Sequence, residues 1–340
     1  MAENENGPVA IVGGGAWGTA LSIHVARNGN AVRLWLREAE LVTRMRERHD
    51  NPVYLPGVVV PQGVRPFDSL GPTLDAAGVV VVAVPSQFAR AIYREMSPKL
   101  PAGVPVVVAC KGIEEETLDL PLDVARDELG RDARLAVLSG PTFAAEVAEG
   151  RPAAIVVASE DEALASQVQE RLSSSLLRLY TNTDAVGVQV AGALKNVIAI
   201  AVGIGDSLGM GTNARAALIT RGLAEITRLG LSLGGRPSTF SGLAGLGDLV
   251  LTCTGELSRN RGVGRRIGHG ERLQDILAGS RSVAEGVRTA LSARRLARRA
   301  GVDMPIVEEV HRILYEDGPP HEALERLMSR PLTSEHESGA

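Results

Sequence analysis

The sequence contains few aromatic residues and few cysteines, and each scarcity excludes a class of protein. Phe, Trp and Tyr make up 3% of the 340 residues, so any core must be built from Ala, Val, Leu and Ile. The two cysteines, Cys110 and Cys253, lie far apart and outside any CxxC motif, which argues against a disulfide framework or a structural zinc site. The net charge of -4 gives no general attraction to nucleic acid or acidic membranes, so an anionic ligand would need a local basic cluster.

The sequence also lacks the usual signs of secretion and of membrane insertion. The first six residues, Met-Ala-Glu-Asn-Glu-Asn, are acidic and polar, the reverse of a secretory n-region. The longest strongly apolar runs, such as residues 77–85, are too short to cross a bilayer, which takes about 20 residues. We therefore expect a cytoplasmic protein that neither inserts into membranes nor binds nucleic acid.

Short apolar runs alternate with helical stretches over the first half of the chain. The runs that predict buried strands are residues 9–12, 31–36, 79–84, 104–109, 135–138 and 154–158. A helix is predicted over residues 16–28, because Asn28-Gly29 is a typical end signal. Strands that alternate with helices predict a parallel, doubly wound sheet.

The second half of the chain has a different pattern. Residues 186–205 are mostly apolar, and residues 213–229 and 283–299 have the amphipathic pattern of long helices. No strand pattern is evident there. We predict an α/β protein with a Rossmann-like, doubly wound domain over residues 1–182 and an all-α domain over residues 183–340. A homodimer is a further hypothesis, since the apolar helices can outnumber what one core buries.

Residues 13–18, Gly-Gly-Gly-Ala-Trp-Gly, form a GxGxxG motif between a predicted strand and a predicted helix. Glycines permit the tight turn and let backbone N–H groups approach a pyrophosphate at the positive end of the helix. The motif alone is a weak signal in a chain with 38 glycines. Its strand–turn–helix context is what favours a dinucleotide site over a plain structural turn.

The end of the second predicted strand bears on the choice between NAD(H) and NADP(H). An acidic residue there binds ribose hydroxyls and selects NAD, whereas an arginine can pair with a 2′-phosphate. Arg37 and Glu38 supply one of each, and such an exposed pair can also be a solvated turn. We favour NADP(H), with NAD(H) as the alternative.

Lys195 and Asn196 interrupt the apolar segment of residues 191–201. Desolvation lowers the pKa of a buried amine toward neutrality, which suits a proton donor and acceptor. A lysine that extends from the helix edge to solvent is equally compatible with this segment. Asp248 and Thr252 are four residues apart, on one face if helical, and Asp248 could orient Lys195 or simply lie near a helix N-terminus.

Polar residues follow two of the predicted strands. Lys111 comes just after residues 104–109, and Gly140 and Thr142 come just after residues 135–138. The carboxyl ends of such strands face the ligand crevice, so these residues are placed to meet substrate or cofactor. A solvated loop lysine and a Thr142 near a helix cap are the plainer interpretations.

Ser258, Arg259, Asn260 and Arg261 supply the local basic cluster that an anionic substrate needs. A guanidinium donates two parallel hydrogen bonds, which fits a phosphate. An exposed polar turn is the alternative interpretation of the same residues.

Seven segments carry a resemblance to a known family. They are GGGAWGTAL (13–21), NPVYLPG (51–57), CKGIE (110–114), SGPTFAAEVA (139–148), GALKNVIAIAVGIGDSLGMGTNARAALITRGLAEI (192–226), GLAGLGDLVLTCTGELSRNRGVG (242–264) and VAEGVRTA (283–290). Together they closely resemble the bacterial-type NAD(P)-dependent glycerol-3-phosphate dehydrogenases. The resemblance implies reversible NAD(P)H-dependent reduction of dihydroxyacetone phosphate to sn-glycerol 3-phosphate, without a metal. The product would supply glycerophospholipid synthesis.

The resemblance also implies roles for individual residues. Lys195 is the implied acid/base, with Asp248 and Asn196 fixing its orientation and Lys111 beside it. The substrate residues are Lys111, Gly140, Thr142, Lys195, Asp248, Ser258, Arg259 and Asn260, to which the helical spacing adds Thr252. The cofactor residues are Gly13, Gly15, Ala16, Trp17, Gly18, Arg37, Lys111, Ala144, Arg259, Val283 and Glu285.

Two departures from the family pattern, and two rival functions, accompany this prediction. Family members often have serine where this chain has Ala16, so one hydroxyl contact is lost, and Arg37 occupies a variable position.

One rival is another Rossmann dehydrogenase with a helical domain, of the 3-hydroxyacid type. The other is a non-catalytic NADPH-binding regulator, which would bind the cofactor without turnover.

Overall fold

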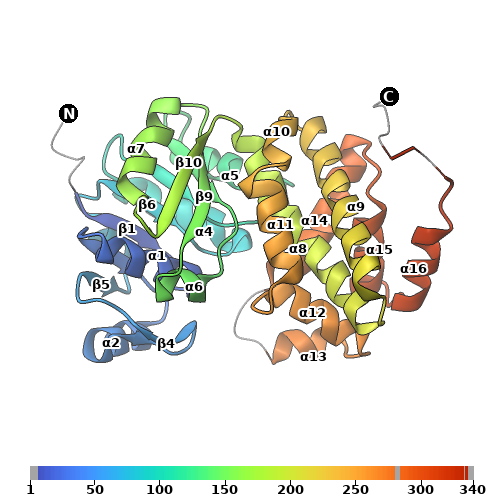
Figure 1. The fold of residues 1–340 in the computed structure, drawn as a ribbon. Helices are drawn as coiled ribbons and strands as arrows, with labels where there is room; N and C mark the ends of the chain where they lie inside the picture. Colours follow the sequence, from blue (N-terminus) through green and yellow to red (C-terminus); the bar gives the residue numbers. More distant parts are fainter. Residues whose placement is uncertain (1–6, 280–283, 333, 336–340) are drawn as a thin grey trace.

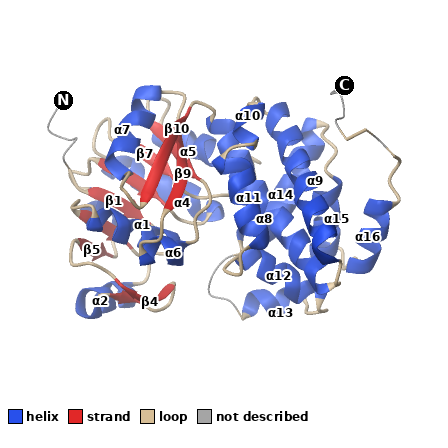
Figure 2. Cartoon of the chain, in the orientation of Figure 1, coloured by secondary structure: helices blue, strands red, loops and turns tan. Residues whose placement is uncertain are grey.

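The structure is a computed structural model that describes residues 7–279, 284–332 and 334–335. A sheet covered by helices forms the first half of the chain, and a group of helices forms the second half (Figure 1). The strands are confined to the first half of the described chain, as the colouring by secondary structure shows (Figure 2).

An eight-stranded sheet forms the centre of the first half, in the order β10-β9-β8-β7-β6-β1-β2-β5. Its strands are β1 (Val9–Val12), β2 (Val32–Trp35), β5 (Val64–Phe67), β6 (Val79–Val82), β7 (Val106–Val108), β8 (Leu135–Ser139), β9 (Ala153–Ala158) and β10 (Leu177–Asn182). Neighbouring strands are parallel except β8 and β9, which are antiparallel. The prediction of a doubly wound, mainly parallel sheet is therefore confirmed.

Helices cover both faces of the sheet, because alternate residues of its strands point to opposite sides. Val9 and Ile11 of β1 belong to one buried cluster, and Ala10 and Val12 belong to another. The first cluster includes residues of α1 (Ala16–Arg27), α2 (Ala39–Arg48), α6 (Ala144–Glu149) and α7 (Glu162–Leu172). The second includes residues of α3 (Leu70–Leu74), α4 (Ser86–Met96) and α5 (Pro121–Leu129). A 3₁₀ turn, η1 (Ser97–Lys99), follows α4.

Four strands and one reversal of direction do not follow from the sequence pattern. β5 and β10 alternate buried with exposed residues and β5 contains Pro66, so neither has the apolar run of a central strand. β3 (Asp50–Asn51) and β4 (Leu55–Val59) form a small separate hairpin. The five-residue β8 extends over roughly 17 Å, whereas the six residues of α6 extend over only about 9 Å. α6 is therefore too short to return the chain to the amino end of β8, and the chain enters β9 beside the carboxyl end of β8.

The second half is helical throughout its described residues. Its elements are α8 (Ala185–Ser207), α9 (Gly211–Ser232), α10 (Pro237–Phe240), the π-helix η2 (Leu243–Gly247), α11 (Asp248–Thr254), α12 (Arg259–Gly268), α13 (Leu273–Ala278), α14 (Glu285–Ala300), α15 (Pro305–Tyr315) and α16 (Pro320–Met328). α8 packs against α9, α11, α12, α14 and α15. The three long helices predicted from the sequence are α8, α9 and α14, and the proposed division at residue 182 falls where β10 ends.

α8 is the centre of the helical half, and its composition corrects one expectation. Among the described residues it is the one helix long and apolar enough to cross a membrane, with a mean hydropathy of 1.7, so the prediction that apolar runs are too short is wrong for α8. However, 89% of that window is buried inside the protein. Its apolar surface therefore forms the core of the helical half.

Glu225 of α9 is a buried carboxylate that joins α9 to α15. Its side chain is 2% exposed and accepts hydrogen bonds from the backbone N–H groups of Ile306 (2.7 Å) and Val307 (3.2 Å). Burial outweighs these two bonds and raises the pKa of Glu225 from 4.5 to about 7. A carboxyl group with a raised folded-state pKa binds its proton more tightly when folded, so its contribution to stability is lost as pH rises from about 4.5 to 7.

We expect Glu225→Gln to reduce the dependence of stability on pH. The group accounts for a loss of about 3 kcal/mol of unfolding free energy between pH 4.5 and 7 in the parent protein, and the variant should not show this loss. Urea unfolding at pH 5 and pH 7.5 measures the difference, with the exposed Glu47→Gln as the control. Equal pH dependence in the parent and the Glu225 variant would show that Glu225 does not titrate in this range.

Candidate active site

Lys195 is buried in the middle of α8, and two residues of α11 contact its amine. The residue is 6% exposed, and its Nζ donates to Asp248 Oδ1 (2.5 Å) and to Thr252 Oγ1 (2.8 Å). Asp248 is fully buried and Thr252 is 5% exposed. The two residues lie on one face of a helix, as their spacing predicts, and that face is directed at Lys195.

A second lysine reaches Asp248 from the sheet. Lys111, in the loop after β7, donates from Nζ to Asp248 Oδ2 (2.8 Å) and to the backbone oxygen of Gly140 (3.2 Å). Thr142 Oγ1 donates to the same Gly140 oxygen (3.3 Å). The structure thus brings the loops after β7 and β8 together with the lysine of α8, and one carboxylate pairs with both amines.

The surroundings of Lys195 shift its acidity. Burial lowers the pKa of Lys195 from 10.5 to about 8, the attraction of Asp248 opposes this shift, and the positive charge of Lys111 adds to it. An amine with a pKa near 8 is mainly charged at neutral pH and can lose its proton readily. Lys195 is therefore suited both to donate and to accept a proton.

Asn196 and Asn260 join three helices beside Lys195. Asn260 Nδ2 donates to Asn196 Oδ1 (2.9 Å), and Asn260 Oδ1 accepts from the backbone N–H of Gly286 at the start of α14 (3.0 Å). A Cβ on Gly203 of α8 would lie 2.1 Å from a backbone oxygen of α12, so glycine is required for this close crossing. The Asn196 side chain accepts from Asn260, so the role of Asn196 in fixing the orientation of Lys195 stays a prediction.

The start of α12 places an exposed cation beside these residues. Ser258 caps the helix, because its Oγ accepts from the backbone N–H of Arg261 (3.3 Å), and Arg259 follows it on the surface. Glu285, the first residue of α14, is half-buried as a residue, yet desolvation of its carboxyl group raises its pKa to about 7 against the attraction of Arg259 and Lys111. Arg259 and Glu285 are therefore close enough for their charges to interact.

The glycine motif forms a tight turn that is open on one side. Gly13 has φ +121°, and a Cβ on Gly18 would lie 1.8 Å from the backbone oxygen of Gly13, so the turn and the close packing both require glycine. A Cβ on Gly15, at the N-cap of α1, would have no atom within 4 Å. The open side of this turn fits a pyrophosphate at the N-terminus of a 12-residue helix.

The other predicted cofactor residues lie mainly along the carboxyl edge of the sheet. Ala16 and Trp17 begin α1, where Trp17 packs against the core, and Ala144 begins α6 after β8. Arg37 follows β2 with its side chain 73% exposed and pairs with Glu38. Trp35, the last residue of β2, donates from Nε1 to the backbone oxygen of Asp68 (3.2 Å). Val283 lies outside the described residues.

Two residues at this edge have no role predicted from the sequence. Asn51 is 1% exposed and donates from Nδ2 to the backbone oxygen of Gly14 (2.9 Å) and to Thr19 Oγ1 (2.9 Å), so it supports the glycine turn. In the sequence, Asn51 is the first residue of the NPVYLPG segment, one of the segments that carry the family resemblance. Phe88 lies in the first turn of α4, after β6, and is 50% exposed. In the sequence, it could have been noticed as an aromatic residue that follows a predicted strand in a chain with few aromatics.

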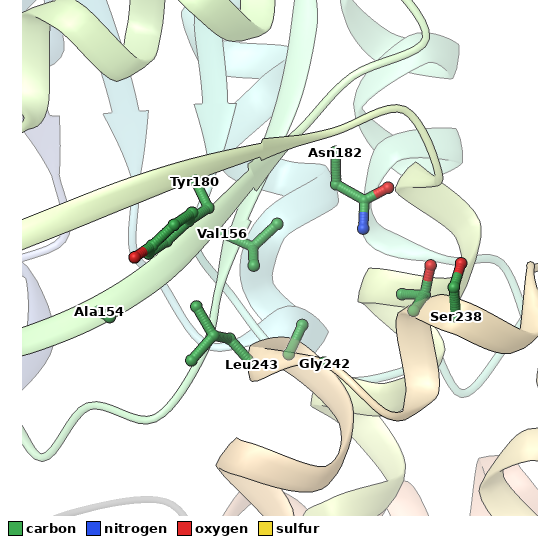
Figure 3. Close-up of a pocket in the computed structure, with 9 residues that line it drawn as sticks. Ala154, Val156, Tyr180, Asn182, Ser238, Gly242 and Leu243 are labelled. Carbon is green, nitrogen blue, oxygen red and sulfur yellow. The ribbon is translucent and has the colours of Figure 1, made fainter.

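A cavity of about 410 Å³ lies at a different place, between the end strands of the sheet and the α10–η2 segment (Figure 3). Tyr180, Val156 and Asn182 of the strands face Ser238 and Leu243 across it. None of the predicted site residues lines this cavity. The candidate active site is therefore the cluster around Lys195 and not this hollow.

Comparisons with known proteins identify the family of this chain. Residues 8–165 match the model of the NAD-dependent glycerol-3-phosphate dehydrogenase N-terminus, and residues 184–325 match that of the C-terminus. The chain is 50% identical to glycerol-3-phosphate dehydrogenase [NAD(P)+] of Geobacter sulfurreducens over 336 residues, covering 96% of this chain and 98% of the relative. It is 49% identical to the protein of the same name from Syntrophotalea carbinolica over 329 residues, covering 96% and 99%.

A solved structure shows the same similarity in three dimensions. The crystal structure of glycerol-3-phosphate dehydrogenase from Coxiella burnetii superposes with a TM-score of 0.92 at 39% identity, covering 95% of this chain and 99% of that one. The matches extend over both the sheet and the helical half. The chain belongs to the bacterial-type NAD(P)-dependent glycerol-3-phosphate dehydrogenase family, as its sequence segments predict.

Proposed function

We propose that this protein catalyses the reversible NAD(P)H-dependent reduction of dihydroxyacetone phosphate to sn-glycerol 3-phosphate. The observation that carries the proposal is the buried Lys195 amine, paired with Asp248 and adjacent to Lys111. The arrangement supports a role for Lys195 as proton donor where the carboxyl edge of the sheet meets the helical half. Relatives at about 50% identity that cover nearly the whole chain carry the name of this activity.

Lys195 acts as the acid in the direction of reduction. When bound, the reduced nicotinamide supplies the hydride that the carbonyl carbon of the substrate receives. The Lys195 ammonium stabilises the negative charge on the carbonyl oxygen and gives it a proton, which leaves a neutral amine to be reprotonated from solvent. In the reverse direction the neutral amine takes the proton of the hydroxyl group. Asp248 and Thr252 hold Nζ in place for both directions.

Arg259 and its neighbours hold the phosphate of the substrate in this proposal. Arg259 is an exposed guanidinium at the N-terminus of the ten-residue α12, where the helix dipole also favours an anion. Ser258 and Asn260 flank it, although in this structure their side chains bond within the protein. A phosphate held there is remote from the reacting carbonyl, so the contact positions the substrate against Lys195.

The residues around the glycine motif hold the dinucleotide, and we propose NADP(H) over NAD(H) because the exposed Arg37 guanidinium can bind a 2′-phosphate in exchange for its surface pair with Glu38. We further propose a cytoplasmic location, supply of glycerophospholipid synthesis and assembly as a homodimer.

A non-catalytic NADPH-binding regulator is not favoured, since a buried lysine–aspartate pair serves proton transfer and not binding alone. A 3-hydroxyacid dehydrogenase is not favoured by the relatives' names.

The first test follows nicotinamide absorbance with dihydroxyacetone phosphate as substrate and NADPH or NADH as cofactor. We expect rapid oxidation of at least one cofactor, and a higher kcat/KM with NADPH. Lys195→Ala should lower kcat about 10²- to 10⁴-fold, because it removes the general acid, while Lys99→Ala on the surface should not. A Lys195 variant with near-full activity would overturn the assignment.

The second test concerns the pH dependence of the reaction. Reduction needs the charged amine, so kcat/KM for dihydroxyacetone phosphate should fall as pH rises through about 8, the pKa of Lys195 in the free protein. Asp248→Asn removes the charge that raises this pKa, so the fall should move to lower pH. Asp132→Asn in an exposed loop is the control. An unmoved profile in the Asp248 variant would contradict the role of the ion pair.

The third test separates two glycines of the motif. Gly15→Ala should fold as the parent does, because the added Cβ meets no protein atom, yet it should weaken NADPH binding by occupying the space of the pyrophosphate. Gly18→Ala should lower the melting temperature, because its Cβ collides with the backbone of Gly13. Calorimetric titration and thermal unfolding measure both effects. Parent-like NADPH affinity in Gly15→Ala would place the pyrophosphate elsewhere.

A further inference from the structure

We infer that Arg261 is a positioning residue that sets the distance between the proton donor and the phosphate-binding end of the site. It does so by joining the end of α11 and the start of α12 to Asp206, near the end of α8. The inference rests on the proposed function, because it concerns the helices that hold the two ends of dihydroxyacetone phosphate. Arg261 acts through these helices and does not itself bind the substrate.

Arg261 differs from Arg259, although both belong to one basic cluster in the sequence. Arg261 is 7% exposed, whereas Arg259 is exposed. Residues two apart on a helix lie about 200° apart around its axis, so the two side chains leave α12 on different sides. Arg259 is therefore available to an anion, while Arg261 points into the protein.

The Arg261 guanidinium binds three groups from three segments. Its Nε donates to Asp206 Oδ2 in the last turn of α8 (2.8 Å). Its Nη1 donates to the backbone oxygen of Thr254, the last residue of α11 (3.1 Å), and to Glu256 Oε1 in the following loop (2.8 Å). Carbonyl groups in the last turn of a helix have no partner within that helix, so Arg261 also completes the end of α11. One side chain of α12 thus holds α8, α11 and the loop that leads into α12.

Asp206 is the fixed point of this contact. Its side chain is 11% exposed, and its Oδ1 accepts from Arg215 Nε of α9 (2.8 Å) while its Oδ2 accepts from Arg261. A carboxylate near the negative end of a helix is unfavourable by itself, and the two guanidinium groups offset this effect. The carboxylate is therefore held from α9 and from α12 at once.

Lys195 and Asp206 lie on the same side of α8. Asp206 comes eleven residues after Lys195, which is about three helical turns and about 16 Å of rise. α11 begins where Asp248 binds Lys195. It ends where Arg261 joins Thr254 to Asp206. α11 is thus attached to α8 near both of its ends.

Cys253 of α11 lies close to both ion pairs. Its side chain is fully buried, directly after Thr252. Burial raises the pKa of this thiol to about 12, and the charges of the Lys195–Asp248 pair and of the Arg261–Asp206 pair also act on it. The two pairs are therefore parts of one packed unit.

The placement of these helices matters because the proposed substrate carries its carbonyl and its phosphate on one small molecule. The carbonyl has to reach Lys195 while the phosphate lies at Arg259. Asn260 joins the start of α12 to Asn196, and Arg261 joins it to α11, the helix that holds the Lys195 amine. A displacement of about 1 Å can lower the rate about 100-fold, so a loose link would misalign the substrate without removing any group that contacts it.

Arg261→Gln tests the inference in the whole protein. Asp206 keeps Arg215 and Glu256 keeps Arg265 (3.1 Å), so the variant leaves neither acid without a cation and should fold. We expect kcat/KM for dihydroxyacetone phosphate to fall about 10- to 100-fold. Arg265→Gln is the matched control, because it removes an exposed guanidinium of the same helix that also pairs with Glu256, and it should keep the activity of the parent.

Inorganic phosphate separates a loss of alignment from a loss of phosphate binding. It needs only the binding groups at the start of α12 and not their distance from Lys195. Its inhibition constant, measured in competition with dihydroxyacetone phosphate, should therefore stay near that of the parent in Arg261→Gln. Arg259→Ala should raise the same constant about 10- to 100-fold, because it removes a charged hydrogen-bond donor.

Two further variants test the route through Asp206. Arg261→Lys keeps the charge but not the fork of donors, so its activity should lie between those of the parent and of Arg261→Gln. Asp206→Asn should lower kcat/KM in the parent background and lower it less in the Arg261→Gln background, because the two residues act as one unit. Thermal unfolding identifies the folded variants, and Asp206→Asn and Arg261→Lys decide the result if Arg261→Gln does not fold.

Each way of failing gives a different result. A folded Arg261→Gln with the kcat/KM of the parent or of Arg265→Gln overturns the inference. Loss of phosphate inhibition in Arg261→Gln also overturns it, because Arg261 would then form the phosphate site itself. A parent protein that does not reduce dihydroxyacetone phosphate, or that phosphate does not inhibit, would instead refute the proposed function, and the inference with it.

Discussion

The architecture depends on one buried carboxylate that is shared by two lysines. Asp248 is fully buried, and Lys195 and Lys111 each donate to one of its oxygens. Any one of these charges alone in the interior would be costly, and removing one partner of a buried pair typically costs about 3–5 kcal/mol. Lys111 comes from the sheet and the other two come from the helical half. The same contacts that neutralise the charges therefore also join the two halves at the proposed site of proton transfer.

The apolar character of α8 follows from this placement. α8 packs against α9, α11, α12, α14 and α15 and against the sheet at β8, and a helix covered on all sides is hydrophobic all round. Its hydropathy therefore resembles that of a membrane span, although its residues are buried in protein. Glycine at Gly203 lets α12 cross closely enough to bring Asn260 to Asn196. The residues proposed for proton transfer and for phosphate binding thus lie at one close helix crossing.

Local patterns in the sequence are sufficient for some parts of the fold and not for others. The strand before the glycine motif, the long helices, and the face that Asp248 and Thr252 share all follow from spacing within a few residues. The strand β5, with Pro66, and the antiparallel direction of β9 do not, because they depend on the length of connections and on neighbours far along the chain. The bond between Asn196 and Asn260 joins residues 64 positions apart, and no periodicity encodes such a contact.

The scarcity of aromatic residues has an optical consequence. The chain has two tryptophans, and both lie beside the proposed nucleotide site: Trp17 in the glycine motif and Trp35 at the end of β2, two residues before Arg37. The helical half contains no indole at all. The tryptophan fluorescence of the protein therefore originates from one edge of the sheet, and its emission reports on the surroundings of that edge.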